Sequence, residues 1–259
     1  MMLDTGDSAH MRAARRRGDL LPAPPAVSEL ARDRVLAGVP VRVFTPPHPR
    51  GAFLHLHGGG FVYGSSRLQD ERLERLATRC EIVVISVEYR LAPEHPYPAA
   101  LEDCEAVASW LVEKSTFESL AVGGESAGAN LAVVTLLRLR DGLGATGFCA
   151  AALTAGLYDL TLAQVADGDP ALTRADLGSL VDQYAGGASH DDPELSPLFA
   201  DLTGLPPALI AAGARDPLLA DSTRLAERWG GEAAPTIVDG PHSLDTSDLV
   251  GAFLSERVG

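Results

Sequence analysis

The sequence predicts an α/β fold in which a mostly parallel central sheet carries helices on both faces. Three observations predict it. Strand-like and helix-like segments alternate over most of the chain, as in folds built from βαβ units. Residues 82–87 form an unbroken apolar, β-branched run, which is typical of a strand buried on both sides. A Gly-x-Ser-x-Gly motif at 124–128 joins one of the predicted strands to a helix.

The N-terminal half contains strands separated by two amphipathic helices. Apolar residues recur at helical spacing over 66–80 and again over 99–114, so both segments are predicted helices. Residues 35–43 are expected to form a tight strand pair around Gly38. A further strand is predicted at 53–56, before the first helix, and another at 82–87, between the two helices.

The C-terminal half continues the alternation with one interruption. In chain order, we expect a strand at 119–123, a helix at 129–137, a strand at 148–157, a polar helix-like segment at 162–187, a strand at 208–212, a helix at 218–229, a strand at 235–238 and a helix at 244–257. No internal repeat or low-complexity tract divides the chain. The length of 259 residues suits one α/β domain, so residues 1–259 are assigned to a single domain.

Composition excludes several classes of function. The formal net charge of −14 disfavours nucleic acid as a partner, because phosphate binding needs a basic surface. No stretch has the length of a membrane span or the features of a secretory signal, so we expect no membrane contact and a cytoplasmic location. Cys80, Cys104 and Cys149 lie in apolar stretches without metal-ligand spacing. They are predicted to be buried free thiols, and neither a metal nor another cofactor is expected.

The segment 124–128 reads Gly-Glu-Ser-Ala-Gly and is the strongest functional signal. In a nucleophile elbow, a strand ends, the chain turns sharply around the serine, and a helix begins. The motif alone is weak in a glycine-rich chain. Here a short apolar strand precedes it and an apolar helix follows, so Ser126 is the predicted nucleophile.

A nucleophilic serine needs a base and an orienting acid, which in this architecture follow it in the order acid, then histidine. Two histidines follow Ser126. His190 lies in a polar stretch and is expected on a surface loop, whereas His242 follows the last predicted strand and is the predicted base. Asp216 directly follows the strand 208–212 and is the predicted acid, with a second role as a helix cap. Asp221, one turn further on, is expected to lie on the surface of the next helix.

The segment 57–60 reads His-Gly-Gly-Gly and also follows a predicted strand. Glycines there expose backbone N–H groups without a side chain in the way, as an oxyanion site requires. His57 precedes the serine and is expected to bond the backbone and hold this loop. His55 is expected to be packed on its strand, and His95 to be structural in a proline-rich loop.

Together these motifs resemble the hormone-sensitive-lipase-like esterases, the bacterial family IV branch of the α/β-hydrolases. The resemblance extends from about residue 38 to the C-terminus, and the matching segments are 57–64, 88–103, 124–131, 196–198, 205–208, 216–218 and 241–242. It implies an α/β-hydrolase fold with a triad of Ser126, Asp216 and His242, and an oxyanion hole formed by the N–H groups of Gly59, Gly60 and Ala127.

The resemblance also implies a small cap over the site, formed from about residues 1–30 and about 162–187. The N-terminal arm is shorter than is usual in the family, and the second piece is polar. Glu125 and Ala129 stand where the family commonly has Asp and Gly. We expect the glutamate to tune the activity without abolishing it.

The function predicted from the sequence is hydrolysis of carboxylic esters with short acyl chains, so the expected partner is a small ester. Two alternatives stay open. One is another acyl-transfer reaction, either formamide or amide hydrolysis or transfer to an alcohol. The other is a non-catalytic relative that binds a small molecule, which the presence of His242 disfavours. The sequence also leaves a homodimer open.

Overall fold

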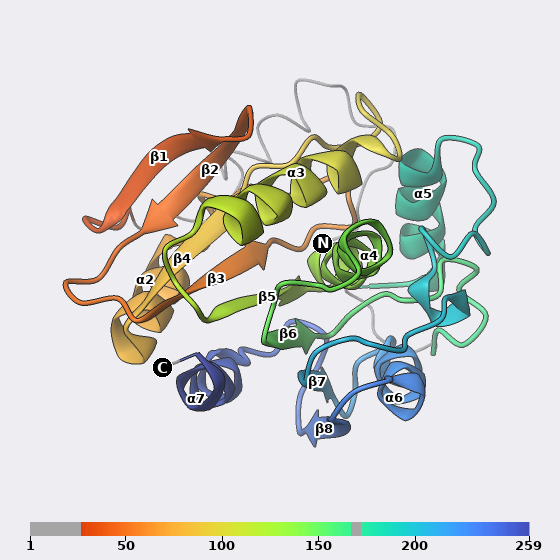
Figure 1. The fold of residues 1–259 in the computed structure, drawn as a ribbon. Coiled ribbons are helices and arrows are strands. Elements are labelled where there is room, and N and C mark those ends of the chain that lie inside the picture. Colours follow the sequence, from red (N-terminus) through yellow and green to blue (C-terminus); the bar gives the residue numbers. More distant parts are fainter. Residues whose placement is uncertain (1–26, 167–171, 259) are drawn as a thin grey trace.

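A single eight-stranded sheet organises the part of the chain that the structure, a computed structural model, describes: residues 27–166 and 172–258 (Figure 1). Its strand order is β1-β2-β4-β3-β5-β6-β7-β8. The strands are β1 (Ala31–Leu36), β2 (Val39–Phe44), β3 (Gly51–Leu56), β4 (Ile82–Val87), β5 (Leu120–Glu125), β6 (Ala150–Thr154), β7 (Ala208–Gly213) and β8 (Ala233–Val238). β1 pairs antiparallel with β2 and β2 with β4, and every other neighbouring pair is parallel. The predicted mostly parallel sheet is confirmed.

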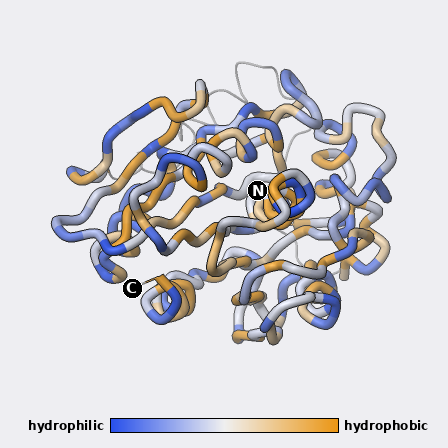
Figure 2. Tube along the Cα trace, in the orientation of Figure 1, coloured by the Kyte–Doolittle hydropathy of each residue, from blue (hydrophilic) through white to orange (hydrophobic). Residues whose placement is uncertain are grey.

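Helices cover both faces of this sheet, as predicted. They are α2 (Asp70–Cys80), α3 (Ala99–Lys114), α4 (Ala127–Leu143), α5 (Arg174–Ala185), α6 (Leu219–Arg228) and α7 (Ser247–Arg257), with a short 3₁₀ turn at Pro197–Phe199. Residues of α3, α4 and α6 share one apolar cluster, and those of α2 and α7 share another. The strands between the two clusters are largely apolar, whereas hydrophilic segments lie mainly on the outer turns (Figure 2).

Several predicted elements have different bounds in the structure; the pair predicted at 35–43, for example, spans 31–36 and 39–44. The helix predicted from residue 66 begins at Asp70, because Glu88 accepts hydrogen bonds from Ser65 and from the backbone and hydroxyl of Ser66 and so holds a turn there. The helix after the elbow is longer than predicted and reaches Leu143. The strand predicted to extend to residue 157 ends at Thr154, where the chain leaves the sheet as a loop.

The segment expected to be polar over 162–187 differs most from its prediction. Among its described residues, 162–166 and 172–187, α5 is the helical part, and it starts with a capping box in which Thr173 and Asp176 bond each other's backbone N–H groups. The inner face of α5 is apolar, with Leu177, Leu180 and Tyr184 buried. The expectation of a polar cap was therefore wrong, because the apolar residues share one face among charged neighbours. The other predicted cap piece, at about 1–30, lies almost wholly outside the described residues.

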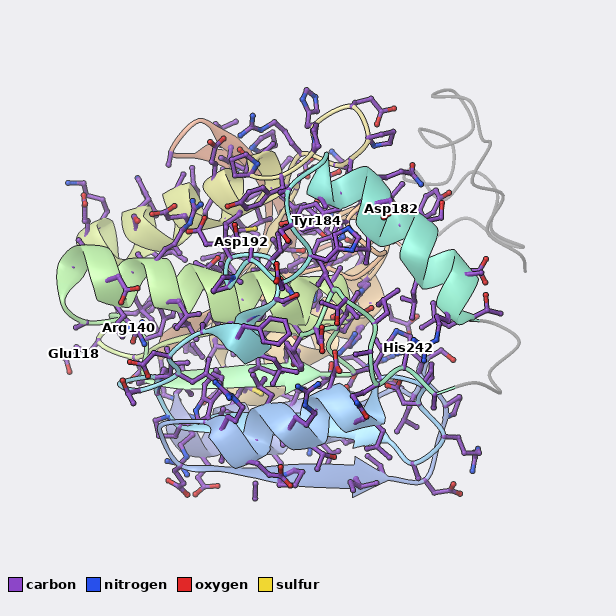
Figure 3. All side chains as sticks on the ribbon, turned by 90° about the vertical axis from the view of Figure 1, so that its right-hand side faces the viewer. Glu118, Arg140, Asp182, Tyr184, Asp192 and His242 are labelled. Carbon is purple, nitrogen blue, oxygen red and sulfur yellow. The ribbon has the colours of Figure 1, made fainter. Side chains whose placement is uncertain are left out.

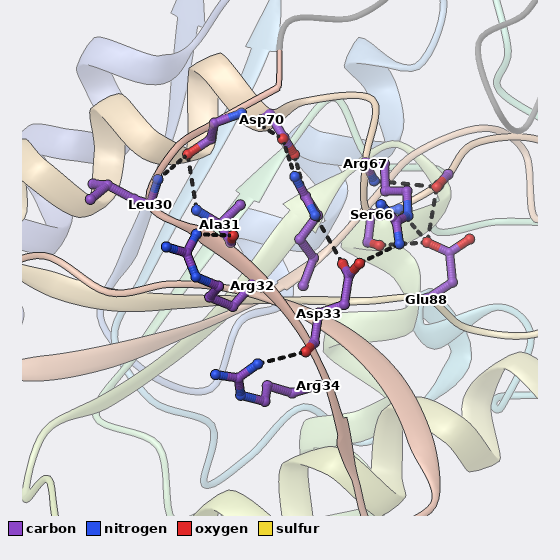
Figure 4. A network of polar contacts seen from close by, with 12 residues as sticks. Leu30, Ala31, Arg32, Asp33, Arg34, Ser66, Arg67, Asp70 and Glu88 are labelled. Atoms are coloured by element: carbon purple, nitrogen blue, oxygen red, sulfur yellow. Dashed lines mark hydrogen bonds and ion pairs between the residues drawn. The ribbon is translucent and has the colours of Figure 1, made fainter.

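A buried arginine fastens the antiparallel hairpin to the rest of the domain (Figure 4). Arg42 on β2 bonds both carboxylate oxygens of Asp70 at the start of α2, and also Asp33 on β1 at 2.9 Å. Asp70 additionally accepts the Ser28 N–H at 2.9 Å. Because this charge pair is buried and multiply bonded, removing one partner would leave an uncompensated charge.

The predicted thiol environments are confirmed at two positions out of three. Cys80 and Cys104 are buried and free, and burial raises the pKa of both thiols. Cys149 is exposed, contrary to the prediction. It directly precedes β6 and its N–H already donates to the carbonyl of Leu120 of β5, but its side chain lies on the exposed side, which an apolar sequence neighbourhood did not indicate.

Candidate active site

Ser126 occupies a sharp turn between β5 and α4. Its backbone has φ 54° and ψ −120°, a conformation that L-residues rarely adopt. The two flanking glycines lie against the same backbone atom of β3. A Cβ on Gly124 or on Gly128 would stand 2.1 or 2.0 Å from the carbonyl oxygen of Leu56. Only glycine fits at either position, so the strained turn that exposes the serine depends on both.

The loops after β7 and β8 bring Asp216 and His242 to this turn. His242 Nε2 lies 3.2 Å from Ser126 Oγ, and His242 Nδ1 lies 2.9 Å from Asp216 Oδ1. The Asp216 side chain has no exposed area, whereas that of His242 is 19% exposed. Asp216 Oδ1 also accepts the Leu218 N–H at 2.8 Å, so this residue orders the turn before α6 as well. The structure therefore brings together the three residues that the sequence singled out.

The glycine loop at 57–60 lies beside the elbow. Gly59 has φ +123° and Gly60 has φ +61°, and the Gly59 carbonyl accepts the N–H groups of Val62 and Tyr63. Within the described residues, no acceptor takes the N–H groups of Gly59, Gly60 or Ala127. These donors stay available for a ligand, as an oxyanion site requires.

His57 holds this loop through a hydrogen bond to its backbone, as the sequence predicted. Its ring is buried, stacks on Tyr89 at 4.1 Å between centroids, and its Nδ1 lies 2.8 Å from the Gly58 carbonyl. The Tyr89 hydroxyl donates to the His57 carbonyl at 2.6 Å. Burial lowers the pKa of His57, so the ring is neutral and serves a structural role.

Three further histidines, His55, His95 and His190, do not contact Ser126, Asp216 or His242. His55 is buried on β3, as predicted. His190 is part-exposed on a loop with its Nε2 3.4 Å from Asp182, which fits its prediction. His95 is exposed, so the structural role assigned to it is limited to its backbone, whose N–H donates to Leu91.

A cavity of about 480 Å³ opens above Ser126. Ser126 and His242 line its base, and its walls are largely apolar. The walls include Phe61, Leu68, Leu157, Leu172, Leu177, Leu180, Val181 and Leu244. In the side view of Figure 3, α5, which carries Tyr184, lies at the same end of the molecule as His242. Sequence reasoning missed the leucines of α5 as wall residues. Their i, i+3 spacing at 177 and 180 was the available signal.

Asp221 is the one acid near the site that the sequence misplaced. It was expected on the surface of α6, but its side chain is buried, and its Oδ2 accepts the N–H groups of Tyr158 and Asp159 at 2.9 Å each. Burial outweighs these bonds and raises the pKa of Asp221 to about 6. The carboxyl holds the loop after β6, which carries the wall residue Leu157.

The described residues offer neither a metal-ligand cluster nor a membrane-spanning helix. No three or more His, Cys, Asp or Glu side chains in this part of the chain are grouped as metal ligands would be. No helix there combines the length and the apolar composition needed to cross a membrane.

Comparison with known proteins agrees with this arrangement. The Abhydrolase_3 family, described as the alpha/beta hydrolase fold, matches residues 53–239. Esterase LipI of Mycobacterium tuberculosis (strain ATCC 25618 / H37Rv) is 34% identical over 256 residues, which cover 90% of this chain and 80% of LipI. Carboxylesterase NlhH of the same strain is 34% identical over 208 residues, covering 74% of this chain and 65% of NlhH.

A solved structure agrees over the whole chain. The crystal structure of an esterase from the bacterial hormone-sensitive lipase family superposes with a TM-score of 0.85 at 30% identity, covering 100% of this chain and 93% of that one. The resemblance inferred from the motifs is thereby confirmed. The chain belongs to the α/β-hydrolase fold family Abhydrolase_3, among the hormone-sensitive-lipase-like esterases.

Proposed function

We propose that this protein is a serine carboxylesterase that hydrolyses esters of short acyl chains, with Ser126 as nucleophile, His242 as base and Asp216 as the orienting acid. The observation that carries the proposal is the continuous contact from Ser126 Oγ to His242 Nε2, at 3.2 Å, and from His242 Nδ1 to the buried Asp216 carboxylate, at 2.9 Å. A serine next to a histidine held by a carboxylate is the arrangement that makes a hydroxyl nucleophilic.

The carboxylate decides which imidazole nitrogen carries the proton. Asp216 accepts at Nδ1, so Nε2 of the neutral ring is free to take the Ser126 proton. As that proton leaves, Ser126 Oγ bonds the ester carbonyl carbon. His242 then returns the proton to the departing alcohol oxygen as the carbon–oxygen bond breaks, which leaves an acyl ester on Ser126.

Water completes the cycle. His242 takes one proton from the water as its oxygen attacks the acyl carbon, and returns that proton to Ser126 Oγ when the carboxylic acid leaves. In both halves of the cycle, we assign the N–H groups of Gly59, Gly60 and Ala127 to stabilise the negative charge that develops on the carbonyl oxygen. Their lack of other acceptors within the described residues supports this assignment.

The size of the cavity supports small substrates. Ligand pockets for drug-sized molecules span about 300–1,000 Å³, and a cavity of about 480 Å³ suits an acetyl to hexanoyl ester of a small alcohol. The reason differs from the one given by the sequence, because the walls are apolar. The volume, and not a polar lining, limits the chain.

The alternatives are weaker. Amide hydrolysis and acyl transfer to an alcohol use the same three residues, so the triad does not select among acceptors. A purely binding role leaves the contact between Ser126 and His242 without a use. A cytoplasmic location, a role in lipid metabolism and a homodimer stay predictions from the sequence and the family.

A chain-length series of p-nitrophenyl esters tests the proposal. The expected result is the highest kcat/KM between acetyl and hexanoyl, and complete loss of turnover after stoichiometric labelling of Ser126 by an organophosphate. Ser126→Ala should not be labelled. Turnover that survives labelling, or that occurs only on long-chain triglyceride emulsions, contradicts the proposal.

A further inference from the structure

Glu125, the residue before the nucleophile, links the elbow to the glycine loop. Its Oε1 accepts the Gly58 backbone N–H at 2.8 Å and the Gln69 side-chain amide at 2.5 Å. Gly58 directly precedes Gly59. Oε1 of Glu125, next to the nucleophile Ser126, thus bonds Gly58, which is next to the proposed oxyanion donor Gly59.

The second oxygen fixes this carboxylate in place. Oε2 lies 3.1 Å from His55 Nε2 and 3.4 Å from an Arg72 guanidinium nitrogen. His55 is itself held by Ser86 at 2.9 Å, and Arg72 by Ser247 at 3.0 Å. The Glu125 side chain is therefore restrained from β3, α2 and the glycine loop, and each restraint has an anchor of its own.

Electrostatics keep the side chain ionised. Burial alone favours the neutral acid, but His55, Arg72 and the Gly58 N–H outweigh it and hold the pKa of Glu125 well below its usual range. A charged acceptor binds a backbone N–H about twice as strongly as a neutral one. The link to Gly58 is accordingly a strong one.

The glycine loop needs such a restraint. Gly59 and Gly60 lack Cβ atoms, so the orientation of the peptide planes that carry the donor N–H groups depends on hydrogen bonds to the loop. His57 bonds the Gly58 carbonyl and the Gly59 carbonyl accepts two N–H groups, and Glu125 holds the peptide before them. Gly58 also packs directly on Glu125: a Cβ there would stand 3.0 Å from the Glu125 carbonyl oxygen. Donors in an oxyanion hole act only when they are held close to the productive geometry.

We infer that Glu125 is a positioning residue, which sets the orientation of the Gly59 and Gly60 N–H groups toward the oxyanion by fixing the Gly58 peptide. The inference rests on the proposed ester hydrolysis. It assigns the side chain a role through its length: aspartate, one methylene shorter, would keep the charge but withdraw from Gly58 and Gln69.

Two variants separate length from charge. Glu125→Asp keeps the charge and shortens the side chain, and Glu125→Gln keeps the length and removes the charge. Glu88→Gln is the matched control, because Glu88 is also a carboxylate that accepts a loop backbone N–H, from Ser66 at 2.7 Å, without contacting the glycine loop. Active sites are counted with a covalent serine reagent, so that misfolded protein does not enter kcat.

The expected result concerns the transition state alone. In Glu125→Asp, kcat should fall about 10- to 100-fold with KM changed less than about threefold. The inhibition constant of a trifluoromethyl ketone, which forms a tetrahedral oxyanion on the serine, should rise by the same factor. Glu125→Gln should lose less, and Glu88→Gln should keep wild-type kcat. If Glu125→Asp fails to fold, the same measurements on Glu125→Gln decide.

Two different failures are distinguishable. An unchanged kcat and inhibition constant per titrated site in both Glu125 variants overturns the positioning role, because a purely structural residue alters only the amount of folded protein. A wild-type protein that does not hydrolyse esters overturns the proposed function instead.

Discussion

Leu180 of α5 packs against Gly60 of the glycine loop. A Cβ on Gly60 would stand 2.5 Å from Leu180 Cδ1, closer than real Cβ atoms approach other atoms. Beside this contact, Phe61 and Tyr184 stack at 3.9 Å with an interplanar angle of 5°. Helix α5 therefore forms both a wall of the cavity and one support of the proposed oxyanion loop.

Gly60→Ala should abolish most turnover. The new methyl group would press on Leu180 Cδ1 and the alanine would have to adopt φ +61°, so Leu180 or the loop must shift, and the strained backbone favours a shift of the loop that misplaces its donor. Loss of one oxyanion donor typically lowers kcat by about 100-fold or more, which steady-state kinetics measure. Gly38→Ala is the control, because Gly38 has φ +83° with open space around it. It should lower stability by about 1–2 kcal/mol without changing kcat. An active Gly60→Ala enzyme would argue against this loop as the oxyanion site.

Leu180→Ala should shift the acyl preference toward longer chains. Removing this wall residue enlarges the cavity, and each additional buried methylene contributes about 0.8 kcal/mol. The ratio of kcat/KM for octanoyl to acetyl esters should therefore rise about 10-fold or more. Leu254→Ala on α7 controls for lost stability, since Leu254 is equally buried but lies across the sheet. If both variants leave the ratio unchanged, Leu180 does not limit the chain.

Removing two triad members should be no worse than removing one. Ser126→Ala and His242→Ala should each lower kcat by about 10⁴-fold or more, and the double variant should match the slower single variant, because the residues act in one step. His190→Ala should keep wild-type kcat, since His190 contacts Asp182 on the cap surface. A double variant far slower than both singles would show that the two residues act independently.

Because of Asp221, the free energy of unfolding should decrease as the pH rises from 4 to 6. The pKa of Asp221 is about 6 in the folded protein against 3.8 in the unfolded chain, so in this window the folded state binds more protons. The free energy of unfolding then falls as pH rises, by roughly 3 kcal/mol for a shift of this size. Asp221→Asn removes that contribution. Urea denaturation of both proteins at pH 4 and pH 7 should show the difference between them changing by up to about this amount.

A constant difference between the two proteins at both pH values would mean that Asp221 is not protonated preferentially in the folded state. Groups with lowered pKa values, such as Asp33 and Asp245, act in the opposite direction but are common to both proteins. Comparing the variants at each pH removes their contribution.

The pattern of apolar residues and glycines within short segments was sufficient to predict the fold class. The apolar run of β4 and the strand–turn–helix around Ser126 are encoded within a few residues, because backbone periodicity and glycine placement are local properties. Element ends were less predictable. The start of α2 depends on Glu88, which lies beyond that helix in the chain and holds the turn before it.

The sequence by itself determined the nucleophile motif, the glycine loop, and His242 and Asp216 as candidates, since each follows a strand whose carboxyl end meets the others at one edge of a parallel sheet. Only the tertiary structure decided that Asp221 is buried, that α5 lines the cavity with leucines, and that Glu125 bonds Gly58. Those features depend on contacts between residues far apart in the chain, such as Gly58 with Glu125, 67 positions apart, and Gly60 with Leu180, which are further apart still. The burial and the bonding partners of a side chain are set by the residues that pack against it in the fold. The sequence on either side of a residue does not specify which residues those are.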